Sequence, residues 1–157
     1  MSITNDEFRL ALSHFASTVT VVTTELESGH PAGITVTAFS SLSLEPPLIL
    51  VCIDHSARIH DRLPKGSHFA VNMLEESQEV ISRRFASSRT DPFEGLDFDR
   101  SAHGCPLLRD VLATLECRVV DRLPGGDHTI VVGKVLAMDV SDRKPLLYFR
   151  SGYTRLQ

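Results

Sequence analysis

The stretch Gly33–Pro47 constrains the fold more than any other part of the chain, because apolar and hydroxyl-bearing side chains alternate along its first half. Side chains two residues apart share a face of an extended chain, so this pattern predicts a β-strand. The hydroxyls of Ser40, Ser41 and Ser43 are more than a packed core tolerates without partners. We therefore expect a polar ligand to lie along this strand.

Further β-branched or alternating runs predict that most of the chain is β-structure. They are Thr18–Glu25, Leu48–Ile53, Phe69–Leu74, Ala113–Val120, His128–Val140 and Leu146–Phe149. Turn-forming residues separate neighbouring runs, and the turn Pro124–Asp127 predicts a hairpin. Because turns join adjacent strands and the predicted helices are short, the pattern favours an antiparallel β-barrel over a doubly wound sheet.

Three helices and one long loop complete the predicted elements. Thr4 and Glu7 form a capping-box pattern, which predicts a helix over Asn5–Ala16. Ser56 is placed to cap a short helix over Ala57–Leu63, and apolar spacing predicts another over Glu75–Ala86. The aperiodic segment Ser87–Pro106 is expected to be a functional or mobile loop, and we consider it a candidate for gating the ligands.

Composition excludes several classes of protein. The 157 residues predict one domain, 1–157, and the net charge of -4 without a basic run argues against binding nucleic acid or an anionic membrane. Apolar runs are too short to span a membrane, and no signal peptide is recognised, so we expect a soluble cytoplasmic protein. The three cysteines show no C-x-x-C spacing, and the histidines are not spaced like metal ligands. We therefore expect neither a disulfide framework nor a metal site.

One local pattern predicts an anion site. A strand delivers the chain to Ser56 at an expected helix N-terminus, where free N–H groups favour a phosphate, and Arg58, Ser40 and Ser41 add donors. The alternative is that Ser56 only caps the helix and Arg58 is solvated. P-loop, dinucleotide-binding glycine and nucleophile-elbow motifs are absent. The residues alone thus predict a small β-barrel with a hydroxyl-lined groove for a phosphorylated ligand.

An ordered set of motifs resembles the flavin reductase-like, FMN-binding split-barrel family, and in particular the small NAD(P)H:flavin oxidoreductase component of two-component flavin-dependent monooxygenases. The motifs are G-I-T-V-T-A-F-S-S-L-S-L-E-P-P-L-I-L-V-C-I, S-A-R-I-H, F-A-V-N-M-L, C-R-V-V, G-G-D-H-T-I-V-V-G-K-V and P-L-L-Y-F-R-S-G-Y. They follow the family order from about Phe8 to Leu156. The resemblance implies a mainly β, antiparallel Greek-key split barrel, a homodimer, and a flavin groove near the subunit interface.

The resemblance also implies individual cofactor-binding residues. Those matched to the flavin ring, ribityl and phosphate are Thr35, Val36, Thr37, Ala38, Ser40 and Ser41. A second matched segment comprises Ile53, Asp54, Ser56, Ala57, Arg58 and His60, and a third comprises Arg84 and Phe85. His128 matches the G-D-H histidine on the nicotinamide side, and Tyr148 and Tyr153 match the segment lining the same mouth. Arg58 stands where the family commonly has a small hydroxyl residue.

The function implied is transfer of a hydride from NADH or NADPH to FMN or FAD, with reduced flavin diffusing to a separate monooxygenase. The cofactors would supply the chemistry, and His128 would position and polarise them. Two alternatives stay open: a flavin- or haem-binding carrier without turnover, and an enzyme like pyridoxamine-phosphate oxidase that retains its flavin. For Thr35 and Thr37 the alternative is β-propensity alone, and for Tyr148 it is core packing.

Overall fold

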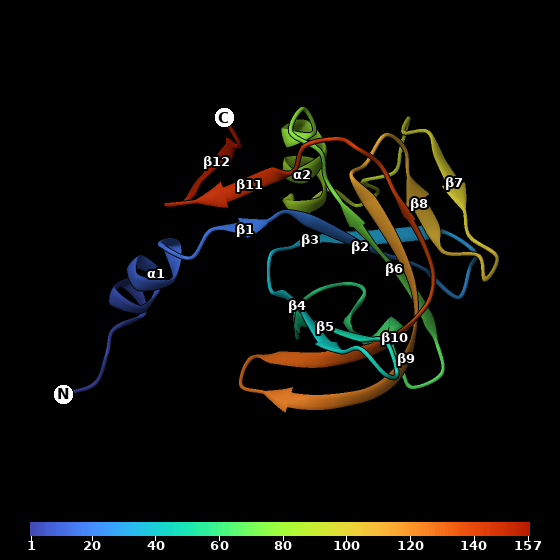
Figure 1. The fold of residues 1–157 in the computed structure, drawn as a ribbon. Helices are drawn as coiled ribbons and strands as arrows, with labels where there is room; N and C mark the ends of the chain where they lie inside the picture. Colours follow the sequence, from blue (N-terminus) through green and yellow to red (C-terminus); the bar gives the residue numbers. More distant parts are fainter.

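A computed structural model describes residues 1–157, and antiparallel β-sheet dominates it (Figure 1). The strands are β1 (Ser17–Thr18), β2 (Thr20–Glu25), β3 (Pro31–Val36), β4 (Phe39–Ser43), β5 (Leu48–Asp54), β6 (His68–Met73), β7 (Phe98–Arg100), β8 (Pro106–Leu108), β9 (Ala113–Gly125), β10 (His128–Val140), β11 (Leu146–Phe149) and β12 (Gly152–Arg155). The helices are α1 (Asn5–Ser13), α2 (Glu79–Ala86) and the 3₁₀ turn η1 (His60–Arg62).

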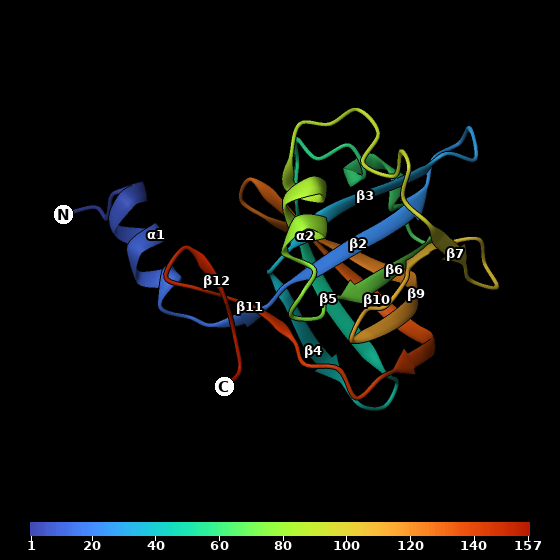
Figure 2. The same ribbon diagram turned by 90° about the horizontal axis from the view of Figure 1, so that it is seen from above.

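Seven strands form one sheet in the order β3-β2-β6-β9-β10-β5-β4, and all its neighbours are antiparallel. The sheet curls on itself (Figures 1 and 2), yet its edge strands β3 and β4 do not pair with one another. The result is a split barrel, open between two strands that are consecutive in the chain. The predicted mainly β, antiparallel split-barrel class is therefore confirmed.

The barrel interior is filled by the apolar side chains of the alternating strands. Val51, Phe69 and Val131 are completely buried there. Gly133 on β10 leaves room for the Phe69 ring, because a Cβ atom at Gly133 would lie 2.6 Å from Phe69 Cζ. The long β9–β10 hairpin thus packs closely on β6.

A second apolar cluster lies outside the barrel, under α2. The Phe93 ring contacts Phe85 and Phe98 edge to face, with ring centroids 4.9 Å apart in each pair. Phe85 and Phe93 are buried together with Leu74 and Leu146. This cluster fixes α2 and the segment that follows it against the outer face of β2 and β3.

Polar contacts fasten the chain around β7 to the barrel. His103 Nδ1 contacts the buried Glu116 carboxylate, and the His103 ring stacks on His68 at 4.3 Å. Burial alone would raise the pKa of Glu116, but hydrogen bonds from Ser101 and His103 outweigh it and lower that pKa below its ordinary value. Glu116 is thus held as a carboxylate.

Two cysteines are buried in the same region. Burial raises the pKa of the Cys105 thiol to about 11 and that of Cys117 to about 12. Both remain thiols near neutral pH and behave as small apolar residues, while Cys52 is half-buried.

Helix α1 stands apart from the sheet. The predicted capping box is present, because Thr4 Oγ1 accepts from Glu7 N at 3.2 Å and the Glu7 carboxylate accepts from Thr4 N at 2.8 Å. None of the residues of α1 is buried, and in both views it projects beyond β11 and β12 (Figures 1 and 2). The helix ends at Ser13 rather than at the predicted Ala16.

Several predicted elements are wrong in extent. The stretch Gly33–Pro47, predicted as one strand, contains two, because the chain leaves the sheet at Thr37 and Ala38 and re-enters it as β4 on the opposite edge. The helix expected from Glu75 begins at Glu79, since Glu75 forms a β-bridge with Pro145. The run Thr18–Glu25 is likewise divided into β1 and β2.

The predicted helix Ala57–Leu63 is absent apart from η1, and the segment Ser87–Pro106 is not a plain loop. It contains β7, which pairs with β8, and buried residues such as Phe93 and Cys105. The C-terminal tail, in which no strand is predicted, forms β12 and pairs Tyr153 with Tyr148. The hairpin at Pro124–Asp127 and the strand Leu146–Phe149 occur as predicted.

No helix of the structure is long and apolar enough to cross a membrane. No group of three His, Cys, Asp or Glu side chains is arranged to hold a metal ion.

Candidate functional site

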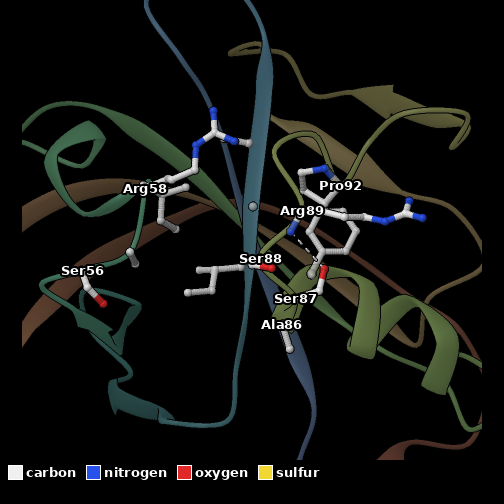
Figure 3. A pocket seen from close by; sticks show the side chains of 13 residues that line it. Ser56, Arg58, Ala86, Ser87, Ser88, Arg89 and Pro92 are labelled. Carbon is white, nitrogen blue, oxygen red and sulfur yellow. Dashed lines mark hydrogen bonds between the residues drawn. The ribbon is translucent and has the colours of Figure 1, made fainter.

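A cavity of about 380 Å³ lies between β3, the segment after β5 and the C-terminal end of α2 (Figure 3). Its floor is formed by Ala32–Ile34 and Phe85. One wall is Ser56–Ile59, and the other is Ala86–Arg89 together with Pro92. Figure 3 shows Ser56 and Arg58 on one side of β3, with Arg89 and Pro92 on the other. Four of the predicted site residues, Ser56, Ala57, Arg58 and Phe85, thus line one cavity.

The floor of the cavity depends on a close approach of α2 to β3. A Cβ atom at Gly33 would lie 2.9 Å from Phe85 Cε1, so glycine lets the buried ring pack against the strand. Thr35 Oγ1 on the same strand donates to the Ser82 carbonyl of α2 at 2.6 Å. The Thr35 side chain therefore orients α2, and its predicted contact with flavin remains a prediction.

The wall after β5 is shaped by an Asp54-centred turn and not by a helix N-terminus. Asp54 Oδ1 accepts from Ser56 N at 2.8 Å and from Ser56 Oγ at 2.7 Å. These hydrogen bonds, mainly that from the Ser56 backbone, lower the pKa of Asp54. The helix-dipole argument for an anion at Ser56 is therefore wrong, because Asp54 already occupies the Ser56 N–H group.

Two arginines organise the opposite wall. Arg84 donates to the carbonyls of Pro92 and Glu94, which bends the chain back after α2. Arg58 donates from the wall after β5 to the carbonyl of Thr90. Arg84 therefore supports the cavity from behind, whereas Arg58 crosses between its walls.

His60 points away from this cavity. Its Nε2 lies 2.7 Å from Thr129 Oγ1 on β10, and its Nδ1 lies 2.8 Å from Asp61 Oδ1. Arg122 Nη1 donates to the carbonyls of His60 and Leu63, at 2.9 and 2.6 Å. These contacts fasten η1 to the barrel, so the His60 side chain has a structural role. Its predicted contact with the flavin remains a prediction.

The remaining predicted residues lie around the open edge of the barrel. Val36 and Ile53 are buried in the core. Thr37 and Ala38, just before β4, and Ser40 and Ser41, within it, are exposed. A second cavity of about 220 Å³ is lined by Phe15, Ala16, Ser17, Thr18, Thr20, Thr37, Phe39 and Met73. The exposed hydroxyls expected to meet a ligand are therefore available, but on a different part of the surface from the larger cavity.

His128 begins β10, where it pairs in register with Asp54. Its Nδ1 lies 2.6 Å from Asp127 Oδ1, and its Nε2 has no hydrogen-bond partner. Tyr153 Oη lies 2.8 Å from Ser82 Oγ, and Tyr148 packs with Tyr153 on the cluster under α2. The Tyr148 side chain thus packs against the apolar cluster, which is the alternative considered for it in the sequence analysis.

The sequence did not single out Ser88, Arg89 or Ala32–Ile34 as lining residues. Ser88 and the Arg89 guanidinium have no hydrogen-bond or ion-pair partner, so both are free donors at the cavity. The sequence does contain an indication that Ser87–Arg89 lies at the site. This segment directly follows the amphipathic helix whose last turn holds the predicted site residues Arg84 and Phe85.

The chain belongs to the flavin reductase like domain family, whose model matches residues 12–157. It is 40% identical over 152 residues to the reductase component of 4-hydroxyphenylacetate 3-monooxygenase of Thermus thermophilus, covering 96% of both chains. It is also 40% identical over 145 residues to the reductase subunit of the stachydrine N-demethylase of Rhizobium meliloti. That match covers 92% of this chain and 63% of the relative.

The chain spans about half of another Rhizobium meliloti relative, a probable flavin reductase to which it is 41% identical over 92% of its own length.

Solved structures agree in fold. The NADH:FAD oxidoreductase of Streptomyces globisporus, in complex with NAD and FAD fragments, superposes with a TM-score of 0.91 at 33% identity, covering 100% of this chain and 98% of the other. The predicted family is therefore confirmed.

The Thr35–Ser82 contact yields a testable prediction. Replacing Thr35 with valine should lower the free energy of unfolding by about 1 kcal/mol, because the hydrogen bond that joins β3 to α2 is lost at nearly constant volume. Thr37→Val is the matched control, since Thr37 is exposed and its side chain makes no hydrogen bond. Urea unfolding curves that shift equally for both variants would contradict the assignment.

Proposed function

We propose that this protein is an NAD(P)H:flavin oxidoreductase that uses FMN or FAD as a diffusing substrate and supplies reduced flavin to a separate flavin-dependent monooxygenase. The single observation that carries the proposal is the cavity at which β3, the segment after β5 and the end of α2 converge. Family membership and the names of the reductase relatives support the same activity.

The residues present fit a phosphorylated aromatic ligand. Ile34, Ile59, Phe85 and Pro92 give the cavity an apolar lining, while Ser88, Arg58 and Arg89 bring donors to its rim. Guanidinium groups suit phosphate oxygens, and no ion pair neutralises Arg58 or Arg89. This combination favours a flavin nucleotide over a metal or a purely apolar ligand.

The flavin, when bound, supplies the redox chemistry by accepting a hydride from the nicotinamide ring. The chain's own contribution is to bind and orient the reactants. Arg58 and Ser88 would hold the phosphate portion at the cavity, while the exposed hydroxyls of Thr37, Ser40 and Ser41 would face the remainder of the ligand. Asp127 holds His128 Nδ1, which leaves Nε2 free to orient the nicotinamide carboxamide or to polarise the ring system.

We also propose a homodimer. The apolar side chains Phe8, Leu12 and Phe15 are 56%, 56% and 77% exposed on and beside a helix that no other element covers. The far half of β10 adds exposed Leu136, Met138 and Val140. Exposed apolar side chains on two elements are typical of surfaces that a second copy covers.

The activity predicts a specific pattern of pyridine nucleotide oxidation. Under anaerobic conditions, NADH or NADPH should be oxidised over many turnovers only when FMN, FAD or riboflavin is added, because the flavin is a substrate and not a resident group. The decrease in near-ultraviolet absorbance measures the rate. Absence of oxidation with every pair, despite measurable flavin binding, would favour the carrier. Oxidation without added flavin that stops once a copurified flavin has been reduced would favour a tightly bound flavoenzyme.

His128→Ala should lower the nicotinamide-dependent rate by about tenfold or more, since a positioning contact is lost, while the flavin dissociation constant changes less than about twofold. Paired steady-state kinetics and flavin titrations measure both quantities. His30→Ala is the matched control, because His30 is exposed and its side chain has no hydrogen-bond partner. Equal losses of rate and flavin affinity in His128→Ala would remove the assignment.

The homodimer predicts that Leu12→Glu yields monomers, because the substitution introduces a charge into the exposed apolar face of α1. Light scattering after size-exclusion chromatography measures the mass. Val80→Glu, on the exposed side of α2, is the control and should remain dimeric. A monomeric wild-type protein would overturn the dimer, and a dimeric Leu12→Glu would overturn the location of the interface.

A further inference from the structure

Only one hydrogen bond joins the two walls of the larger cavity. It runs from the Arg58 guanidinium, after β5, to the carbonyl of Thr90, beyond the end of α2. No backbone hydrogen bond and no ion pair connects these walls. Thirty-two residues of sequence separate the partners, so the contact is a tertiary link made by a single side chain.

The segment that Arg58 holds has few other attachments. Ser87, Ser88, Arg89 and Thr90 are all exposed and belong to no helix or strand. Ser87 Oγ donates to the Arg84 carbonyl at 2.7 Å and accepts from Arg89 N at 3.3 Å, which are contacts within the same stretch of chain. Arg84 fixes the chain again at Pro92 and Glu94. Between these two anchors, the Arg58 side chain makes the one hydrogen bond from another part of the fold.

The charge of Arg58 is poorly matched by this partner. The neutral Thr90 carbonyl accepts one N–H bond from Arg58, whereas a phosphate accepts two parallel bonds from a guanidinium and also neutralises its charge. No carboxylate forms an ion pair with Arg58. Arg89 adds a second unpaired guanidinium at the opposite wall. An anion entering the cavity therefore offers Arg58 a better partner than Thr90 does.

We propose that Arg58 is a specificity-determining residue that exchanges the Thr90 carbonyl for a phosphate oxygen of the ligand, and thereby selects phosphorylated flavins over riboflavin. The inference rests on the proposed function and names the ligand group that this cavity recognises. The phosphate could be that of FMN or the diphosphate of FAD, which share this chemistry. The exchange also releases Ser87–Thr90 from the wall after β5.

Flavin fluorescence titrations of the full-length chain test the selection, using riboflavin, FMN and FAD as separate probes. Arg58→Met removes the charge and donors while keeping an apolar stem of similar length. It should weaken binding of FMN, FAD or both by about tenfold or more, the range expected for a lost charge-assisted contact, and leave riboflavin within about twofold. If Arg58→Met weakens binding of FAD alone, the group that Arg58 contacts is the diphosphate. If it weakens binding of both FMN and FAD, the group is the phosphate that they share.

Two further variants keep the test specific. Arg58→Lys restores the charge without the planar fork and should recover part of the preference, whereas no recovery would contradict a role for charge. Arg62→Gln is the matched control, because Arg62 lies in the same segment, pairs with Glu27 at 2.8 Å and does not line the cavity. It should bind all three flavins as the wild type does; a phosphate-selective loss equal to that of Arg58→Met would overturn the assignment to Arg58.

Limited proteolysis without ligand gives a readout independent of flavin. Trypsin cleavage after Arg89, mapped by mass spectrometry, should be several-fold faster in Arg58→Met than in Arg62→Gln, because the exposed segment has lost its only hydrogen bond to the other wall. Equal cleavage together with unchanged flavin preference would overturn the inference while leaving flavin-dependent turnover intact. A wild-type protein that binds none of the three flavins would overturn the proposed function and this inference together.

Discussion

The close contact between Gly33 and Phe85 is the constraint on which the site depends. Any side chain at position 33 would collide with the ring, so the glycine lets α2 lie directly on β3. The same ring packs edge to face on Phe93, which carries the chain after α2 back toward the barrel. One contact thus sets the floor of the cavity and the course of its second wall, and the Thr35–Ser82 hydrogen bond fixes the orientation of the helix.

The electrostatics of the cavity come from side chains and not from a helix dipole. The C-terminal end of α2 faces this region and carries partial negative charge, which disfavours an anion. The Ser56 N–H group is occupied by Asp54. Arg58 and Arg89 therefore supply the positive charge that a nucleotide phosphate needs. Because both are exposed, they can change partners at little cost in folding energy.

The β-structure was predictable because its signal is local. Two-residue alternation identified the long strands, and Pro124–Asp127 identified the hairpin that holds His128. The start and end of single elements were less predictable. The hydroxyl-rich stretch after Gly33 has the pattern of one strand, but tertiary pairing places its two halves at opposite edges of the sheet. The short helix after Ser56 was expected from its capping residue, yet the Asp54 carboxylate captures that residue in a turn.

The site itself was predictable only in part. Ser56, Arg58 and Phe85 were singled out and line one cavity, while His60 turns toward Thr129 because its ring nitrogen finds a partner there. The Arg58–Thr90 link could not be inferred, since no periodicity relates residues 32 positions apart. Ser88 and Arg89 were overlooked because an exposed polar run after a helix resembles any surface loop.

The most direct test of a flavin site built on β3, the segment after β5 and α2 is a crystal structure of the protein with FMN or FAD. Density for the phosphate portion beside Arg58 and Ser88, with the Arg58 guanidinium turned from Thr90 toward it, is the expected result. Density for the whole flavin in the second cavity beside Phe15 and Phe39, with the Arg58–Thr90 hydrogen bond unchanged, would contradict the assignment of the site.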